Sequence, residues 1–238
     1  MVVGRKRVPK PAAGTITVRK DVLVGRFIVR DLIGNPYNGP VTTLGALSES
    51  KAAWRRALLK QRRTAQESTR SVETEMLHAA MSGWIDERGI STLCAYVPVG
   101  GEPGSLALLD AIRATGCRVL LPVVVGSAPL DWALYAGEES LRRADYGLLE
   151  PSGERLGNGA VAEAGGILVP ALAVDRNGIR LGRGAGHYDR SLPFASDDAE
   201  LVAVVRDSEF VDELPGEEHD VRMSAVLTPE RGVVPLPM

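Results

Sequence analysis

Residues 180–190 hold the densest set of side chains suited to chemistry in this sequence. They read Arg-Leu-Gly-Arg-Gly-Ala-Gly-His-Tyr-Asp-Arg, so glycines alternate with cationic, aromatic and acidic residues. Glycine lets backbone N–H groups approach an anion closely, and successive N–H groups form a concave anion site. Arginine pairs with phosphate through parallel hydrogen bonds, and a carboxylate such as that of Asp189 binds a divalent cation. This stretch therefore favours a nucleotide-phosphate site with magnesium over a tight loop whose charges are merely solvated.

The surroundings of this stretch indicate how it is positioned. The apolar run 166–174 is typical of a buried strand, and Asn177-Gly178 between the two is a turn sequence. The glycines follow G-x-G-x-G spacing, so neither the G-x-G-x-x-G dinucleotide motif nor a G-x-x-x-x-G-K-[ST] phosphate loop is present. A nucleotide bound here would therefore use another architecture.

The composition is that of an ordinary globular chain. Its 238 residues suffice for one large domain or two small ones, and the formal net charge of −2 gives no reason to expect nucleic acid or an anionic membrane as partner. The apolar runs are too short to span a bilayer, and we see no signal peptide. Cys94 and Cys117 fit no metal or C-x-x-C spacing, so we expect buried free thiols and a reduced, cytoplasmic setting.

Residues 1–47 differ from the rest of the chain. They are rich in glycine, proline, valine and basic residues, and Asp21 and Asp31 are their only acids. No helical pattern is visible in them. We expect a basic, disordered or loosely attached extension over 1–47 and a single α/β domain over 48–238.

The domain is expected to begin with two helices, over residues 49–65 and 70–88. On the first, Trp54 and Leu58 share one face at a spacing of one turn. Basic residues form a separate stripe on this helix, and charge alone favours a solvated face: Lys51, Arg55 and Arg62. On the second, apolar residues at helical spacing predict a core-facing stripe: Val72, Met76, Leu77, Ala80, Met81, Trp84 and Ile85. His78 lies near this stripe and is interpreted as a structural histidine.

Strands and helices then alternate. Strands are expected over 91–97, 117–125, 130–135, 161–174, 201–206 and 225–228, helices over 104–114 and 186–192, and mostly loop over 137–160. This alternation predicts an open α/β sheet, in which ligands bind outside the carboxyl ends of the strands. The loop 98–104, with Glu102, and the glycine-rich stretch would both lie there, so that a carboxylate faces a phosphate site.

Three motifs follow one another over about residues 48–230. They are Lys51-x-x-x-Arg55, then Tyr96-Val97-Pro98 followed by Glu102, and finally the run 168–175 leading into residues 180–190. Together they resemble the 5-formyltetrahydrofolate cyclo-ligase family, also called 5,10-methenyltetrahydrofolate synthetase. The segment 146–151, Tyr-Gly-Leu-Leu-Glu-Pro, is also similar to the family, whereas 1–47 has no counterpart.

The resemblance implies an α/β fold of three layers, with an open, mostly parallel sheet flanked by helices, similar to the NagB/RpiA/CoA transferase-like fold. It implies an ATP-dependent ligase that converts 5-formyltetrahydrofolate to 5,10-methenyltetrahydrofolate and releases ADP and phosphate. In this reaction ATP phosphorylates the formyl oxygen before the ring closes. ATP is the co-substrate and Mg²⁺ the metal. We expect a cytoplasmic monomer that binds reduced folate and ATP, and neither nucleic acid nor membrane.

The resemblance also implies roles for individual residues. ATP contacts fall on Lys51, Arg55, Gly182, Arg183, Gly184, Ala185, Gly186, His187 and Tyr188. Folate contacts fall on Val97, Glu102 and Tyr188. Arg183 and Tyr188 are the catalytic residues, and Asp189 is the magnesium ligand.

Two positions depart from the family pattern. His187 stands where the family usually has Tyr or Phe, and Ser224 where an acidic metal ligand can occur, with Asp220 as a stand-in. These departures leave open a cyclo-ligase-like protein without this activity, which binds folate or nucleotide in a regulatory role. A third hypothesis is an RNA-associated protein that uses its basic extension, but the low net charge and the lack of aromatic RNA-binding motifs argue against it.

Overall fold

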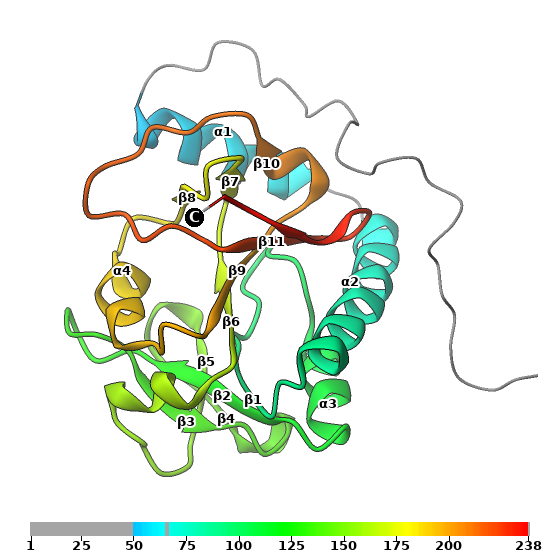
Figure 1. Cartoon of the computed structure of the whole chain (residues 1–238), viewed down its shortest axis with the longest axis vertical. Coiled ribbons are helices and arrows are strands. Elements are labelled where there is room, and N and C mark those ends of the chain that lie inside the picture. Colours follow the sequence, from blue (N-terminus) through cyan, green and yellow to red (C-terminus); the bar gives the residue numbers. More distant parts are fainter. Residues whose placement is uncertain (1–49, 65–66, 238) are drawn as a thin grey trace, which may run out of the picture. The chain divides into compact units, whose positions relative to one another are not determined.

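The computed structural model describes residues 50–64 and 67–237 (Figure 1). The extension expected over 1–47 lies outside these residues, and the division into 1–47 and 48–238 stays a prediction.

A seven-stranded sheet in the order β12-β11-β9-β6-β1-β2-β3 forms the centre of the fold (Figure 1). Its strands are β1 (Thr92–Cys94), β2 (Arg118–Val123), β3 (Asp131–Leu134), β6 (Gly166–Pro170), β9 (Glu200–Val204), β11 (Ala225–Thr228) and β12 (Gly232–Pro235). Each inner strand runs parallel to its inner neighbours, whereas the edge strands β3 and β12 are antiparallel. The prediction of an open, mostly parallel α/β sheet is confirmed.

Helices α2 (Glu67–Arg88) and α3 (Leu106–Ala114) cover one face of this sheet. Leu77 and Trp84 of α2 pack with α3 against strand residues such as Leu168. The expected stripe on α2 is wrong at its start, because Val72 is 56% exposed and Met76 38%. Between residues 71 and 77 of α2, Leu77 is the first buried residue, so Val72 and Met76 do not belong to the core. His78 is exposed rather than a core histidine.

Short helical segments cover the opposite face. They are α4 (His187–Ser191), Leu192–Phe194 and Asn158–Glu163. Val161 and Leu192 from these segments pack against Leu120 and Ile167 of the sheet. The sheet is therefore the middle of three layers, as expected.

A smaller sheet, in the order β10-β7-β8, packs with α1. Its strands are β7 (Ala173–Asp175), β8 (Arg180–Leu181) and β10 (Phe210–Val211), and α1 spans Lys51–Thr64. Trp54 and Leu58 of α1 are buried against Leu172 and Leu181, so the expected apolar face of this helix is confirmed. The strand expected over 161–174 is wrong as one element: it divides into a helical segment, β6 and β7, because the apolar run continues from one sheet into the other.

Residues 137–160, expected to be mostly loop, contain an antiparallel pair of strands, β4 (Leu141–Arg143) and β5 (Leu149–Pro151). Arg142 lies opposite Glu150 in this pair. These strands, like β8 and β10, have at most three residues, which is too short for a periodic pattern to identify.

Candidate active site

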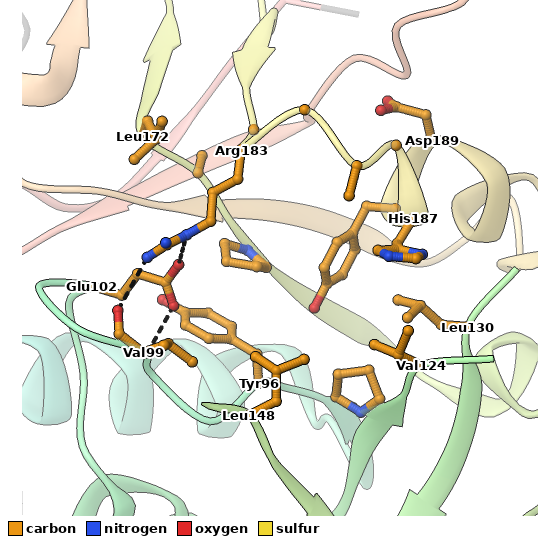
Figure 2. Close-up of a pocket in the computed structure, with 18 of the residues that line it drawn as sticks. Tyr96, Val99, Glu102, Val124, Leu130, Leu148, Leu172, Arg183, His187 and Asp189 are labelled. Carbon is orange, nitrogen blue, oxygen red and sulfur yellow. Dashed lines mark hydrogen bonds and ion pairs between the residues drawn. The ribbon is translucent and has the colours of Figure 1, made fainter. Parts of the chain in front are cut away.

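A cavity of about 990 Å³ lies at the carboxyl ends of β1, β2 and β6 (Figure 2). Its walls come from α1, the loop after β1, the β4–β5 pair, the glycine-rich stretch and the segment 217–220. All the residues to which the resemblance assigns a role line it, namely Lys51, Arg55, Val97, Glu102, Gly182, Arg183, Gly184, Ala185, Gly186, His187, Tyr188 and Asp189. The fold thus brings together the three motifs that the sequence separates.

An ion pair joins the two main loops of the cavity. Arg183 Nε lies 2.9 Å from Glu102 Oε1, and an Arg183 Nη2–H group donates to the Val99 carbonyl oxygen at 3.2 Å. The other carboxylate oxygen of Glu102 accepts a hydrogen bond from the Val99 backbone N–H at 2.9 Å. Figure 2 shows these contacts at the edge of the cavity, above Tyr96. The Glu102 side chain is 9% exposed and that of Arg183 48%, so the carboxylate is fixed more firmly than the guanidinium.

The glycine-rich loop depends on backbone conformations that other residues rarely adopt. Gly184 has φ of +103° and Gly186, directly before α4, has φ of +69°. Arg55 supports the loop from α1, since its Nε donates to the Gly182 carbonyl oxygen at 2.9 Å. Gly182 differs from the other two: its φ is ordinary, and an added Cβ would meet nothing within 4 Å.

Lys51 is held by two acids of the segment 217–220. Its Nζ donates to Glu217 at 2.8 Å and to both carboxylate oxygens of Asp220, at 3.0 and 2.8 Å. Burial alone would lower the pKa of Lys51, but the hydrogen bonds to Asp220 and Glu217 outweigh it and raise that pKa. The same contacts lower the pKa of Asp220 against the effect of its burial. Lys51 and Asp220 are therefore both charged at neutral pH.

The carboxylate of Asp189 is partly occupied. Its Oδ1 accepts from Arg180 Nη2 at 2.7 Å, and the Arg180 side chain is only 4% exposed. Its Oδ2 has no hydrogen-bond partner among residues 50–64 and 67–237, so one hard oxygen stays available to a cation. Figure 2 places this carboxylate well apart from Glu102 and Tyr96.

The alternative metal positions are less suited. Glu217, His219 and Asp220 offer ligand atoms within 4.8 Å of one another, but both acids already form ion pairs with Lys51, whose positive charge opposes the binding of a cation. Ser224 does not line the cavity; its hydroxyl accepts from the Leu201 N–H and donates to the Leu201 carbonyl oxygen. Asp189, which follows the glycine-rich loop directly, therefore remains the candidate ligand nearest to the proposed phosphate site in the sequence.

His187 lines the cavity beside Leu130 and Val124 (Figure 2). Burial, together with the nearby Arg190 guanidinium, lowers the pKa of His187 below 6.5. The ring is therefore neutral at pH 7 and contributes an uncharged aromatic surface, as a Tyr or Phe would.

Tyr188 contributes a buried hydroxyl that has no hydrogen-bond partner within the described part of the chain. Burial raises the pKa of Tyr188 well above 10, so the phenol stays protonated and keeps a donor. Tyr96, which also lines the cavity, instead donates its hydroxyl to the Pro103 carbonyl oxygen at 3.0 Å. Tyr188 is thus the phenol with a free donor for a ligand.

Sequence reasoning missed several lining residues. Glu150 is 6% exposed, and its Oε1 accepts from the Val124 N–H at 2.9 Å. Arg142, Arg143 and Arg155 line the same wall. The similarity of segment 146–151 to the family was the one signal near them.

Arg62 corrects the expected solvated basic stripe. Its side chain is buried and forms two hydrogen bonds of 2.7 Å to the Glu209 carboxylate and a third, also 2.7 Å, to the Ala171 carbonyl oxygen. It does not line the cavity, so only Lys51 and Arg55 of the stripe do. No sequence pattern links Arg62 to a partner so far along the chain.

Fold and cavity together define an α/β protein with a glycine-rich loop at the carboxyl ends of a parallel sheet. In the described residues no helix has the length and apolar character needed to cross a membrane. Residues 47–229 match the model of the 5-formyltetrahydrofolate cyclo-ligase family. The chain belongs to this family, and the prediction of a ligase of the cyclo-ligase family is confirmed.

Individual relatives agree with this assignment. A 5-formyltetrahydrofolate cyclo-ligase from Mycolicibacterium smegmatis is 52% identical over 194 residues, which cover 79% of this chain and 97% of that protein. The Escherichia coli cyclo-ligase is 28% identical over 143 residues, 59% of this chain and 79% of its own. Among solved structures, Aquifex aeolicus 5,10-methenyltetrahydrofolate synthetase superposes with a TM-score of 0.68 at 25% identity, covering 79% of this chain and 93% of that one.

Proposed function

We propose that this protein is a cytoplasmic, monomeric enzyme that converts 5-formyltetrahydrofolate to 5,10-methenyltetrahydrofolate at the expense of ATP. Family membership supports this proposal, and one structural observation links it to particular residues of this chain. Arg183 from the glycine-rich loop and Glu102 from the loop after β1 meet in one cavity. We infer that Arg183 marks a site for a phosphate chain and that Glu102 marks an adjoining site for a heterocycle with N–H donors.

The proposed reaction has two steps. The formyl oxygen attacks the γ-phosphorus of ATP, and the bond from that phosphorus to the ADP oxygen breaks. The neighbouring amine nitrogen of the folate then attacks the activated formyl carbon. The carbon–oxygen bond breaks, phosphate leaves with the electron pair, and the attacking nitrogen loses its proton. Such chemistry depends mainly on positioning and on neutralising the charge of the transferring phosphoryl group.

The cationic side of the cavity supplies the neutralising groups. Among Lys51, Arg55, Arg180 and Arg183, the cations that line the cavity beside the glycine-rich loop, only Arg183 is exposed, and it is the proposed catalytic contact to the γ-phosphate. Lys51 and Arg55, which both lie on α1, bind the phosphates through their side chains. The backbone of Gly182–Gly186 contributes N–H groups.

The folate side needs acceptors for N–H groups and a donor for the formyl oxygen. The Glu102 carboxylate accepts hydrogen bonds from the donor edge of the pterin. Val97, half-buried in the same wall, contacts the ring. The free hydroxyl of Tyr188 donates to the formyl oxygen and orients it.

Magnesium fits one of the predicted positions. Asp189 would hold the ion through Oδ2, because Oδ1 is engaged by Arg180. The bound ion would supply further positive charge to the phosphate chain.

The test is an assay with pure protein, magnesium-ATP and 5-formyltetrahydrofolate. We expect the absorbance of the methenyl product to rise in parallel with ADP and phosphate, in equal amounts, and both to depend on both substrates. Protein that binds folate or nucleotide but never forms the methenyl product would overturn the proposal in favour of a regulatory role. Glu102→Ala should abolish turnover, whereas Arg113→Gln, outside the cavity, should not.

A further inference from the structure

The loop 98–104, which carries Glu102, is held together by several contacts of its own. Glu102 Oε2 accepts from the Val99 N–H at 2.9 Å, and the Glu102 N–H donates to the Val99 carbonyl oxygen at 3.3 Å. Near its end, the Pro103 carbonyl oxygen accepts from the Tyr96 hydroxyl. All these partners lie between residues 96 and 103, so they fix the shape of the loop but not its position relative to the rest of the fold.

Arg206, just after β9, ties this loop to two distant elements. Its Nη1–H group donates to the Gly101 carbonyl oxygen at 2.8 Å, across 105 positions of the sequence. Its Nε lies 3.0 and 2.9 Å from the two carboxylate oxygens of Glu73 on α2. The Arg206 side chain is only 11% exposed, and both Arg206 and Gly101 lie outside the cavity, whereas Glu102 lines it. Arg206 therefore joins β9 and α2 to the loop at the residue directly before Glu102.

Helix α1 limits the same point of the loop. A Cβ added at Gly101 would lie 3.1 Å from the Arg62 Cβ and 3.2 Å from the Arg62 carbonyl oxygen, so the two backbones approach closely. Arg62 is fixed by Glu209, and the same carboxylate accepts the Arg206 backbone N–H at 2.8 Å. The loop thus has little room to shift at Gly101 while Arg206 is in place.

The contact between Arg206 and Gly101 is of a strong kind. A hydrogen bond from an ionised donor contributes more than one between neutral groups, and a carbonyl oxygen that loses its partner in a part-buried place is costly. The Glu73 carboxylate keeps the guanidinium aimed at the loop. Small displacements of a group that contacts a substrate can cost much of its effect, so a contact that fixes the loop bears on substrate binding.

We propose that Arg206 is a positioning residue, which holds the Glu102 carboxylate at its place in the cavity through the Gly101 carbonyl oxygen. This inference rests on the proposed function, in which Glu102 accepts hydrogen bonds from the folate. Arg206 acts on the folate side of the cavity, because the cations assigned to phosphate lie on α1 and in the glycine-rich loop.

The first test separates positioning from stability by kinetics. We expect Arg206→Ala to raise the KM for 5-formyltetrahydrofolate by about tenfold, as for the loss of one charge-assisted hydrogen bond, without raising the KM for ATP. Arg206→Lys keeps a cationic donor and should restore most of the folate KM. A merely structural role would lower the amount of active protein and hence the apparent kcat, but would leave both KM values unchanged. That result would overturn the proposal.

Glu200→Ala is the matched control for stability. Glu200 of β9 also joins this strand to α2, since it accepts from Trp84 Nε1 and pairs with Arg88 at 2.8 Å, but it lies outside the cavity. This variant should lose stability and keep the folate KM. An equal rise of the folate KM in Glu200→Ala would show that any weakened contact between β9 and α2 has this effect, and would contradict a specific role of Arg206.

A second variant tests whether Arg206 acts through Gly101. Gly101→Ala should also raise the folate KM, because its Cβ displaces the loop from Arg62. The double variant Arg206→Ala/Gly101→Ala should show less than the product of the two single effects, since both changes shift the same residue. Effects that multiply in full would show that Arg206 does not act through this point.

Hydrogen exchange tests the inference without any ligand. The Val99 and Glu102 amides should exchange faster in Arg206→Ala than in the wild type, whereas Glu200→Ala should leave their rates unchanged. Unchanged rates in Arg206→Ala would overturn the proposal. If the wild type binds 5-formyltetrahydrofolate without turnover, the Kd replaces the KM: a higher Kd in Arg206→Ala then keeps the positioning role and removes the proposed reaction. Turnover with a folate KM that Arg206→Ala does not change keeps the reaction and removes the positioning role.

Discussion

Arg183 and Glu102 form an ion pair with 2.9 Å between Nε and Oε1, although 81 positions separate them in the sequence. One is the proposed phosphate contact and the other the proposed pterin contact. A nucleotide that draws Arg183 toward its phosphates therefore removes a competitor from Glu102. We therefore expect the recognition of the two proposed substrates to be coupled through this pair.

The coupling can be measured with a non-hydrolysable ATP analogue. In the wild type we expect the analogue to lower the Kd of the folate, and the folate to lower the Kd of the analogue by the same factor. Arg183→Ala should abolish this mutual effect and reduce kcat by about a hundredfold or more, as for loss of one transition-state donor. Independent binding of both ligands in the wild type would show that the ion pair does not link them.

Gly182→Ala separates the role of the loop in binding from its role in folding. A Cβ at Gly182 meets nothing within 4 Å and its φ is ordinary, so we expect an unchanged melting temperature. The KM for ATP should rise, because the added methyl group keeps phosphate from the backbone N–H groups.

Gly153→Ala is the matched control for that substitution. A Cβ at Gly153 would also meet nothing within 4 Å, but Gly153 lies outside the cavity. The melting temperature and the KM for ATP of this variant should therefore both equal those of the wild type. A Gly182→Ala enzyme with normal KM for ATP would show that phosphate does not approach this glycine.

The buried Arg62–Glu209 pair should dominate the polar contribution to stability. Glu209→Ala leaves a guanidinium that is 3% exposed without its carboxylate, and we expect a loss of about 3–5 kcal/mol in the free energy of unfolding. Asp212→Ala breaks the exposed Arg176–Asp212 pair and should cost about 1 kcal/mol or less. Denaturant titration of both variants measures the difference, and equal losses would contradict the assignment.

His187 should make the folded protein sensitive to mild acid. Its folded pKa lies below the ordinary 6.5, so the unfolded chain binds the proton more readily. The free energy of unfolding of the wild type therefore falls as the pH drops through 6.5. His187→Tyr should remove the share of this fall that is due to His187. Melting temperatures on either side of this pH test the prediction, with His78→Gln, an exposed histidine on α2, as control. The expectation fails if His187→Tyr keeps the wild-type pH dependence.

The sequence predicts well those features that depend on neighbouring residues. The Trp54–Leu58 face, β11 and the short helix after the glycines follow from local spacing and composition. The position of the glycine-rich loop beside Glu102 follows from the rule that ligands bind at the carboxyl ends of parallel strands. These elements define most of one side of the cavity.

The remaining features depend on contacts between distant parts of the chain. Val72 and Met76 have the correct spacing for burial, but helical periodicity does not show where contact with the core begins. Arg62 looks like a surface cation until Glu209 is brought against it. The strands β4 and β5 have three residues each, so no periodic pattern identifies them, and the family-like segment 146–151 was the only signal in the sequence near Glu150 and the neighbouring arginines.

The glycine-rich loop connects two separately packed hydrophobic clusters. It leaves β8, which is packed on α1 through Leu181, and enters α4, which is followed by Leu192 on the main sheet. Each cluster can open with its own free energy, so the amide hydrogens of β7 and β8 should exchange with solvent at a rate different from those of β6 and β9. A substitution such as Trp54→Ala would then loosen one anchor of the loop while the main sheet keeps its protection.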